Sequence, residues 1–329
     1  MGNLCFACKK PKDLTLEHII PQAIGGRLKA KLYCNECNKM FGYTLDKEIS
    51  KQFGKIGTVL NIKRERGKTQ TFEVKELSSG TPLIFNGKCF KRKSPIVKIT
   101  SKDGKKLDFA DITARSKKEL EKKCASIKES YEVSGEGKTF QETHPGPTKT
   151  QNEITISNPL LRRAVSKIAY SFLCIKIPKD IILSSVFEGV RDYIKAGKGP
   201  DLACANFIYT QFMTDYTRPL HKIHIALNRS EKLVIAYVSL FGIYRYSILL
   251  AENFESQFEW PGLDYTFDPV SLQEVVGNDN FRAPHTSKEN ILHPKQSREF
   301  ILSELNKGYK IIENYVDDYR FLSGEIVDK

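Results

Sequence analysis

The spacing of apolar residues predicts two short strands and a helix within residues 1–54. Residues 14–20 are apolar and partly β-branched, and Pro21 ends them, so this stretch is predicted to be a strand. Gly25-Gly26 marks a turn or loop, and a second short strand is predicted at residues 29–33. From Asn38 onward apolar side chains recur at helical spacing, namely at Met40, Phe41, Leu45, Ile49 and Phe53. The predicted order is strand, loop, strand, helix.

The rest of the chain alternates between strand and helix patterns, so we expect an α+β fold of no identified type. Strands are predicted at residues 71–77, 96–100, 106–112, 221–227, 232–241 and 244–250. Helices are predicted at residues 116–128, 181–197 and 296–321. The chain therefore divides into residues 1–54, a β-rich basic segment at 55–130, a polar linker or long loop at 131–158, and an α+β domain at 159–329.

The clearest helix begins at Asn158-Pro159, where an N-cap residue precedes a proline suited to the first helical turn. Its predicted apolar face consists of Leu160, Leu161, Ala164, Val165, Ile168, Ala169 and Phe172. The basic residues Arg162, Arg163 and Lys167 are predicted to lie off that face.

Composition and charge describe a globular protein with a basic surface. The chain has 329 residues, enough for two domains, and 40% of them are hydrophobic. No apolar run is long enough to span a bilayer, and no apolar signal segment precedes the first cysteines, so we expect a cytoplasmic protein without a membrane partner. The formal net charge of +13 favours polyanionic partners such as nucleic acid, although a basic face of this kind can also be merely solvated.

Two Cys-x-x-Cys pairs predict a metal centre near the N-terminus. Cys5, Cys8, Cys34 and Cys37 would complete a closed tetrahedral site, and a closed site indicates a structural zinc ion. The alternatives are four unrelated cysteines or two disulfides, and a reducing compartment argues against disulfides. The other cysteines lack ligand spacing and are expected to be buried or inert thiols: Cys89, Cys124, Cys174 and Cys204.

The 25 residues between the two cysteine pairs contain Glu17-His18, the strongest candidate for chemistry. Adjacent residues of a regular strand point to opposite faces, so these two side chains could share one substrate only if the alternation were broken. The remaining histidines lack a motif and are expected to have ordinary surface or core roles: His144, His221, His224, His285 and His293.

The sequence CxxC, then LEHIIPQAIGG, then CNECN, followed by Phe41-Gly42 and Asp46, resembles the HNH endonuclease family, and more narrowly its zinc-knuckle branch. The resemblance covers about the first 55 residues. It implies a zinc-stabilised ββα-metal finger, which agrees with the predicted order of elements. One departure from the family pattern is that no histidine follows Asn38 before His144.

The resemblance also implies roles for individual residues. His18 matches the general base that activates water, and Glu17 matches the acidic residue that binds the catalytic divalent ion. Asn38 matches the asparagine that ligates this ion or orients the site, with Asn35 as the alternative and Asp46 as the nearest candidate for an additional metal contact. Each residue also has a non-catalytic alternative. His18 could be a packed or zinc-adjacent histidine, Glu17 a surface carboxylate and Asn38 a helix-capping residue.

Three functions follow as expectations. The first is a metal-dependent HNH endonuclease that hydrolyses DNA with Mg²⁺ or another divalent ion. In this function the C-terminal region would select the substrate or regulate the activity. The expected biological setting is restriction or anti-phage defence. The second is an RNA-cleaving HNH nuclease, because both polymers offer the same phosphodiester. The third is a non-catalytic, zinc-stabilised module that binds nucleic acid. The oligomeric state is left open, a homodimer included.

Overall fold

The structure is a computed structural model, and it describes residues 3–65, 67, 70–76, 80, 82–87, 90–101, 104–114, 116–133, 150–151, 155–156, 158–213, 215, 217–255, 263–275 and 286–322. The chain has an α+β fold and divides into two compact units. One unit combines residues 1–68 with residues 154–329, and the other comprises residues 69–153. Three residues with predicted roles lie outside the described residues, namely Cys89, His144 and His285. Most of the predicted linker also lies outside them.

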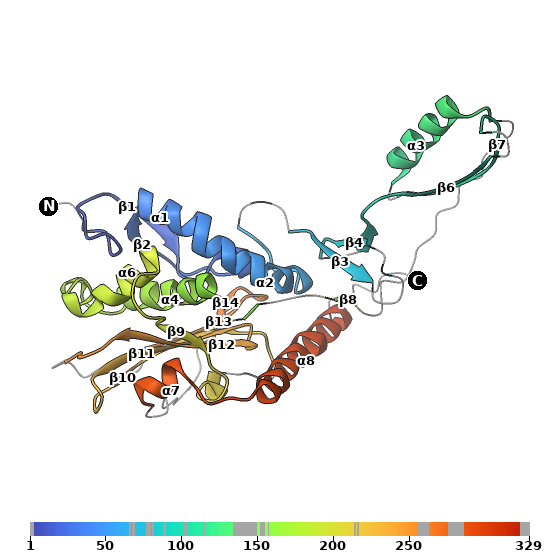
Figure 1. Cartoon of the computed structure of the whole chain (residues 1–329). Coiled ribbons are helices and arrows are strands. Elements are labelled where there is room, and N and C mark those ends of the chain that lie inside the picture. The colour runs from blue at the N-terminus through green and yellow to red at the C-terminus, as the bar shows by residue number, and fades with distance from the viewer. Residues whose placement is uncertain are drawn as a thin grey trace. The chain divides into compact units, whose positions relative to one another are not determined.

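The first unit begins with a small antiparallel hairpin followed by helices (Figure 1). Its elements are β1 (Leu14–His18), η1 (Gln22–Ile24), β2 (Lys29–Cys34), α1 (Asn35–Phe41), the π-helical turn η2 (Gly42–Asp46) and α2 (Lys47–Val59). This order agrees with the predicted strand, loop, strand and helix, but the helix begins at Asn35, three residues before the predicted start. The turn between the strands needs Gly26, because a Cβ atom there would lie 1.8 Å from the carbonyl oxygen of Ile20.

The larger part of the first unit is built on a six-stranded sheet with the order β14-β13-β10-β11-β12-β9. Its strands are β9 (Ala203–Ala205), β10 (His221–Asn228), β11 (Leu233–Leu240), β12 (Tyr244–Ala251), β13 (Leu263–Asp268) and β14 (Gln273–Glu274). All neighbouring strands are antiparallel. Every residue of β11 and β12 is buried, which explains the near-continuous apolar sequence that predicted these strands.

Helices cover this sheet. They are α4 (Pro159–Cys174), α5 (Lys179–Ile182), η3 (Ser185–Phe187), α6 (Glu188–Ala196), η4 (Gln211–Met213), α7 (Lys288–Leu292) and α8 (Arg298–Leu322). Figure 1 shows α4 lying between the sheet and the N-terminal helices α1 and α2. As predicted, α4 is capped by Asn158, whose Oδ1 accepts a hydrogen bond from the backbone N–H of Leu161 at 2.7 Å. The single helix predicted at 181–197 is wrong, because the chain breaks at residues 183–184 and continues as η3 and α6.

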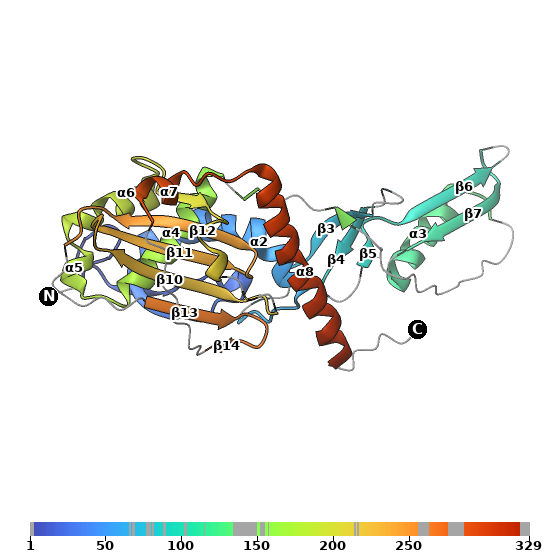
Figure 2. The same cartoon turned by 90° about the horizontal axis from the view of Figure 1, so that it is seen from below.

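The described residues of the second unit form two small sheets and one helix (Figure 2). A four-stranded sheet has the order β5-β4-β3-β8, made of β3 (Phe72–Glu76), β4 (Pro82–Phe85), β5 (Phe90–Arg92) and β8 (Thr150–Gln151). A separate hairpin is formed by β6 (Ile96–Ser101) and β7 (Leu107–Thr113), and α3 (Lys117–Ser130) follows it. Ser116 caps α3, since its hydroxyl accepts a hydrogen bond from the Glu119 N–H.

A membrane span is not found in the part of the chain that the structure describes: none of its helices combines the necessary length with the necessary apolar character.

Candidate active site and metal centre

The four predicted zinc ligands form one cluster of thiols. Their Sγ atoms all lie within 4.8 Å of one another, and those of Cys8 and Cys34 are 3.9 Å apart. Four thiolates around zinc, each with a bond of about 2.3 Å, would have their sulfur atoms about 3.8 Å apart. All seven described cysteines are free thiols, so the disulfide alternative is wrong for this cluster. The spacing and the soft donor set fit a zinc ion.

The local chain positions these thiols for metal binding. Cys5 and Cys8 lie on the turn before β1, Cys34 ends β2, and Cys37 lies in the first turn of α1. A hydrogen bond from the Cys37 thiol lowers the pKa of Cys5 to about 4, and backbone N–H groups, including that of Cys34 at 3.2 Å, add to this effect. Because zinc binds the thiolate form, these hydrogen bonds already favour the charge state of a zinc ligand at Cys5.

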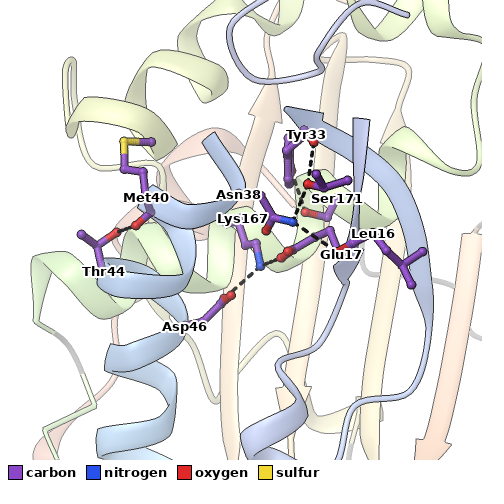
Figure 3. A network of polar contacts seen from close by, with 10 residues as sticks. Leu16, Glu17, Tyr33, Asn38, Met40, Thr44, Asp46, Lys167 and Ser171 are labelled. Atoms are coloured by element: carbon purple, nitrogen blue, oxygen red, sulfur yellow. Dashed lines mark hydrogen bonds and ion pairs between the residues drawn. The ribbon is translucent and has the colours of Figure 1, made fainter. Parts of the chain in front are cut away.

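Glu17 and Asp46 meet at a third residue, Lys167 of α4. The Lys167 ammonium is hydrogen bonded to Glu17 Oε1, and it donates to Asp46 Oδ1 at 2.9 Å (Figure 3). The Lys167 side chain is 0% exposed, whereas the side chains of Glu17 and Asp46 are 5% and 24% exposed. The sequence placed Lys167 off the apolar face of its helix and did not predict that its side chain is buried. This side chain is buried because two carboxylates compensate its charge.

The charges of this cluster depend on one another. Burial acts to lower the pKa of Lys167, but the attraction of Asp46 and Glu17 outweighs it, so the pKa is raised and the ammonium stays charged at neutral pH. Burial raises the pKa of Glu17, and the attraction of Lys167 offsets this only in part. With both carboxylates ionised, the cluster has one positive and two negative charges.

Asn38 lies in α1 beside β1, the strand that carries Glu17. Its Nδ2 donates to Thr15 Oγ1 at 2.8 Å and to the carbonyl oxygen of Leu16 at 3.1 Å. These contacts are made where the pairing of β1 with β2 shifts, between Thr15 and Leu16. The capping alternative for Asn38 is wrong, because α1 begins at Asn35, which is exposed, and Asn38 lies within the helix.

His18 has different partners from Glu17, as expected for neighbours on a strand. Its Nε2 donates a long hydrogen bond of 3.4 Å to Glu65 Oε2, and Lys29 donates to the same oxygen at 2.5 Å. Arg27 lies 3.9 Å from the other oxygen of Glu65. Partial burial lowers the pKa of His18, outweighing the hydrogen bond to Glu65 that favours the charged ring. The imidazole is therefore neutral at neutral pH and 27% exposed.

The structure thus divides the predicted site residues into two neighbouring groups. Glu17, Asp46 and Asn38 lie on the side of β1 that faces α1 and α4, and His18 lies with Glu65. Sequence reasoning missed Lys167 and Glu65. Neither stands in a motif, and they are 150 and 47 positions from their partners Glu17 and His18, so no local signal marks them.

The two histidines of β10 are not brought together. His221 is fully buried, and its Nε2 donates to the carbonyl oxygen of Ile24 at 2.8 Å, while its Nδ1 accepts from the backbone N–H of Phe241 at 3.2 Å. His224 instead donates through Nδ1 to Asp264 at 2.5 Å. His221 therefore fastens the loop after β1 to the large sheet.

Comparison with known proteins identifies the N-terminal segment. Residues 5–54 match the family model described as HNH endonuclease, and this match contains the whole thiol cluster together with Glu17, His18, Asn38 and Asp46. The chain therefore carries an HNH-type domain at its N-terminus, followed by an α+β region. Searches of the curated proteins and of the solved structures found no match.

Proposed function

We propose that this chain is a metal-dependent endonuclease that hydrolyses phosphodiester bonds in DNA, with His18 as the general base. The observation that carries the proposal is the placement of His18 within the matched segment 5–54. It is a partly exposed, neutral imidazole with a carboxylate on one ring nitrogen and two basic side chains close by.

The contacts of His18 suit proton abstraction from water. Glu65 accepts the hydrogen bond from Nε2, so Nδ1 carries the lone pair, and Nδ1 has no hydrogen-bond partner among the residues that the structure describes. Nδ1 would take the proton of a water molecule, and Glu65 would stabilise the imidazolium that forms. The resulting hydroxide forms a new P–O bond as the bond to the leaving oxygen breaks, and that oxygen takes a proton from solvent.

Positive charge beside His18 would bring the phosphate to the base. Lys29 lies opposite His18 in the β1–β2 register, and its side chain is 28% exposed. Arg27 is 19% exposed and approaches the same carboxylate of Glu65. Both cations are partly neutralised by Glu65, which leaves a net positive charge at the mouth of the proposed site.

A divalent ion such as Mg²⁺, when bound, would neutralise charge on the phosphate and on the leaving oxygen. The residues that we propose to hold it are Glu17 and Asn38, with Asp46 as an additional contact. The two carboxylates and one amide oxygen suit a hard cation. In the structure both carboxylates hold the Lys167 ammonium, so the ion can bind between them only if the ammonium is displaced.

The substrate proposal rests on charge and on the family. A net charge of +13 suits a polyanion, and DNA is preferred to RNA on the resemblance alone. The setting that we propose, restriction or defence against phage, rests on the same resemblance. The resemblance does not extend to the C-terminal region, which we propose to select the substrate or to regulate activity.

Nicking of supercoiled plasmid tests the proposal. Wild type should cleave with Mg²⁺ or Mn²⁺ and not with EDTA, and His18→Ala should lower the rate by about 100-fold or more at unchanged zinc content. His293→Ala is the matched control, because His293 is exposed and lies outside the matched segment. An RNA substrate is assayed in parallel. Equal cleavage by wild type and His18→Ala would refute the role of His18.

A second candidate is a zinc-stabilised module that binds nucleic acid without cutting it. One observation favours it, namely that Lys167 already engages both carboxylates expected to bind the catalytic ion. Zinc-loaded wild type that cleaves neither DNA nor RNA, but binds them with a steep dependence on salt, would support this candidate and contradict the nuclease.

A further inference from the structure

The α4 helix of the C-terminal region is built into the HNH-type domain through three side chains. Lys167 bonds to Glu17 and Asp46, and the Ser171 hydroxyl shares a 2.7 Å hydrogen bond with the hydroxyl of Tyr33 (Figure 3). The Tyr170 hydroxyl donates to the carbonyl oxygen of Phe6 at 2.9 Å. All three α4 residues are buried. The HNH-type domain therefore rests on a helix that lies outside the matched segment 5–54.

Lys167 lies where a cation is needed. Two carboxylates from separate elements, β1 and η2, point at one nitrogen atom, as Figure 3 shows. Without a positive charge between them, two largely buried carboxylates would repel each other and would lose hydration without compensation. The ammonium meets this need with a single charge, so with both carboxylates ionised the cluster carries a net charge of −1.

The backbone that carries Lys167 is held firmly. Its neighbours on α4 are packed into the main core, and Val165, Ile168 and Ala169 are 0% exposed. A rigid helix with a buried lysine at this point presents one fixed ammonium to Glu17 and Asp46. Loss of that ammonium would leave a charge of −2 on a pair of oxygen ligands, which is the condition that favours a hard divalent ion.

We propose that the Lys167 ammonium and a divalent cation are alternative occupants of one position between Glu17 and Asp46. In this arrangement α4 sets the metal affinity of the HNH-type domain, because the ion binds there only as the ammonium leaves. The inference deepens the proposed function, which it takes as the reason for a divalent ion at these carboxylates. Its test measures metal binding and stability and does not require cleavage.

The decisive variant is Lys167→Met, which keeps the length of the side chain and removes its charge. Zinc-loaded protein would be titrated with Mn²⁺ and followed by electron paramagnetic resonance, and its thermal midpoint would be recorded with and without Mn²⁺. Mn²⁺ prefers oxygen ligands and should leave a four-thiolate zinc site intact, which a zinc assay confirms. The matched control is Arg245→Met, since Arg245 and Glu304 form another buried ion pair in the same unit, with side chains 1% and 3% exposed.

We expect both single variants to lower Tm in metal-free buffer, by roughly 5–10 °C, because each removes a buried cationic partner of a buried carboxylate. Glu304 keeps a second partner, Lys307, at 2.6 Å. Mn²⁺ should restore at least about half of the loss in Lys167→Met, which should bind the ion about tenfold or more tightly than wild type. Arg245→Met should show no restoration. Equal responses of all three proteins to Mn²⁺ would overturn the proposal and make Lys167 a purely structural partner.

The double variant Glu17→Gln with Lys167→Met covers the case in which the single variant does not fold. It has the same net charge in the cluster as wild type, so it should be more stable than Lys167→Met without metal and should gain no tight Mn²⁺ site. If Lys167→Met fails to fold with and without Mn²⁺ while the double variant folds, the ion cannot replace the ammonium and the proposal is overturned. A metal gain in Lys167→Met with no cleavage by any variant would instead refute the nuclease and leave this inference standing.

Discussion

Acid should weaken the attachment of the HNH-type domain to the large sheet through His221. This side chain is fully buried on β10, donates to the carbonyl oxygen of Ile24 and accepts from the N–H of Phe241. A protonated ring could still donate to Ile24, but it would have no acceptor for the Phe241 N–H, so the two contacts together need the neutral ring. Burial lowers the pKa of His221 to about 4, against an ordinary value of 6.5. The folded state therefore resists a protonation that the unfolded chain accepts.

The sign and size of the effect follow from this difference. Between pH 6.5 and about 4 the unfolded chain binds the proton and the folded chain does not. The contribution of His221 to the free energy of unfolding is therefore fully present above pH 6.5 and is lost as the pH falls towards 4. Over the full interval the loss is about 3 kcal/mol, at about 1.4 kcal/mol for each unit of pKa difference. Between pH 7.5 and 5.5 the same relation gives a loss of about 1.3 kcal/mol.

Urea unfolding at pH 5.5, 6.5 and 7.5, with zinc present, measures this contribution. His221→Gln is the comparison variant, because its amide can donate and accept but does not titrate. The other titratable groups remain in both proteins, so their contributions to the pH dependence cancel in the difference. We expect wild type to lose about 1.3 kcal/mol more than His221→Gln between pH 7.5 and 5.5. Parallel pH dependences of the two proteins would refute the reasoning.

Two further predictions concern the frame of the HNH-type domain. Cys34→Ser should lower the bound zinc from one equivalent towards none, as measured by metal analysis, and should destabilise β1 and β2, as measured by hydrogen exchange of these strands. Full zinc content in the variant would contradict the four-thiol site. Gly26→Ala should cost about 2 kcal/mol or more in urea unfolding, because its Cβ would lie 1.8 Å from the Ile20 carbonyl oxygen. Gly42→Ala is its control, since nothing lies within 4 Å of a Cβ there and the backbone is helical, so stability should be unchanged or higher.

The sequence by itself determined the features that depend on local chemistry. The two Cys-x-x-Cys pairs predicted the thiol cluster, because each pair sits on one tight turn and needs little from the rest of the chain. Asn158-Pro159 predicted the start of α4, since capping is a contact between residues three positions apart. The apolar runs of β11 and β12 predicted strands, because a strand buried on both faces has little room for polar side chains.

Only the tertiary structure decided what surrounds the candidate site. The helical pattern placed Lys167 off the apolar face and gave no sign of its burial, because such a pattern cannot reveal a carboxylate that lies 150 positions away in the sequence. The same holds for Glu65 at His18 and for Ile24 at His221. The sequence likewise did not predict the break within the helix expected at 181–197, because residues 183–184 contain neither proline nor glycine. Local propensity encodes the elements, whereas the pairing of buried charges exists only when distant elements pack together.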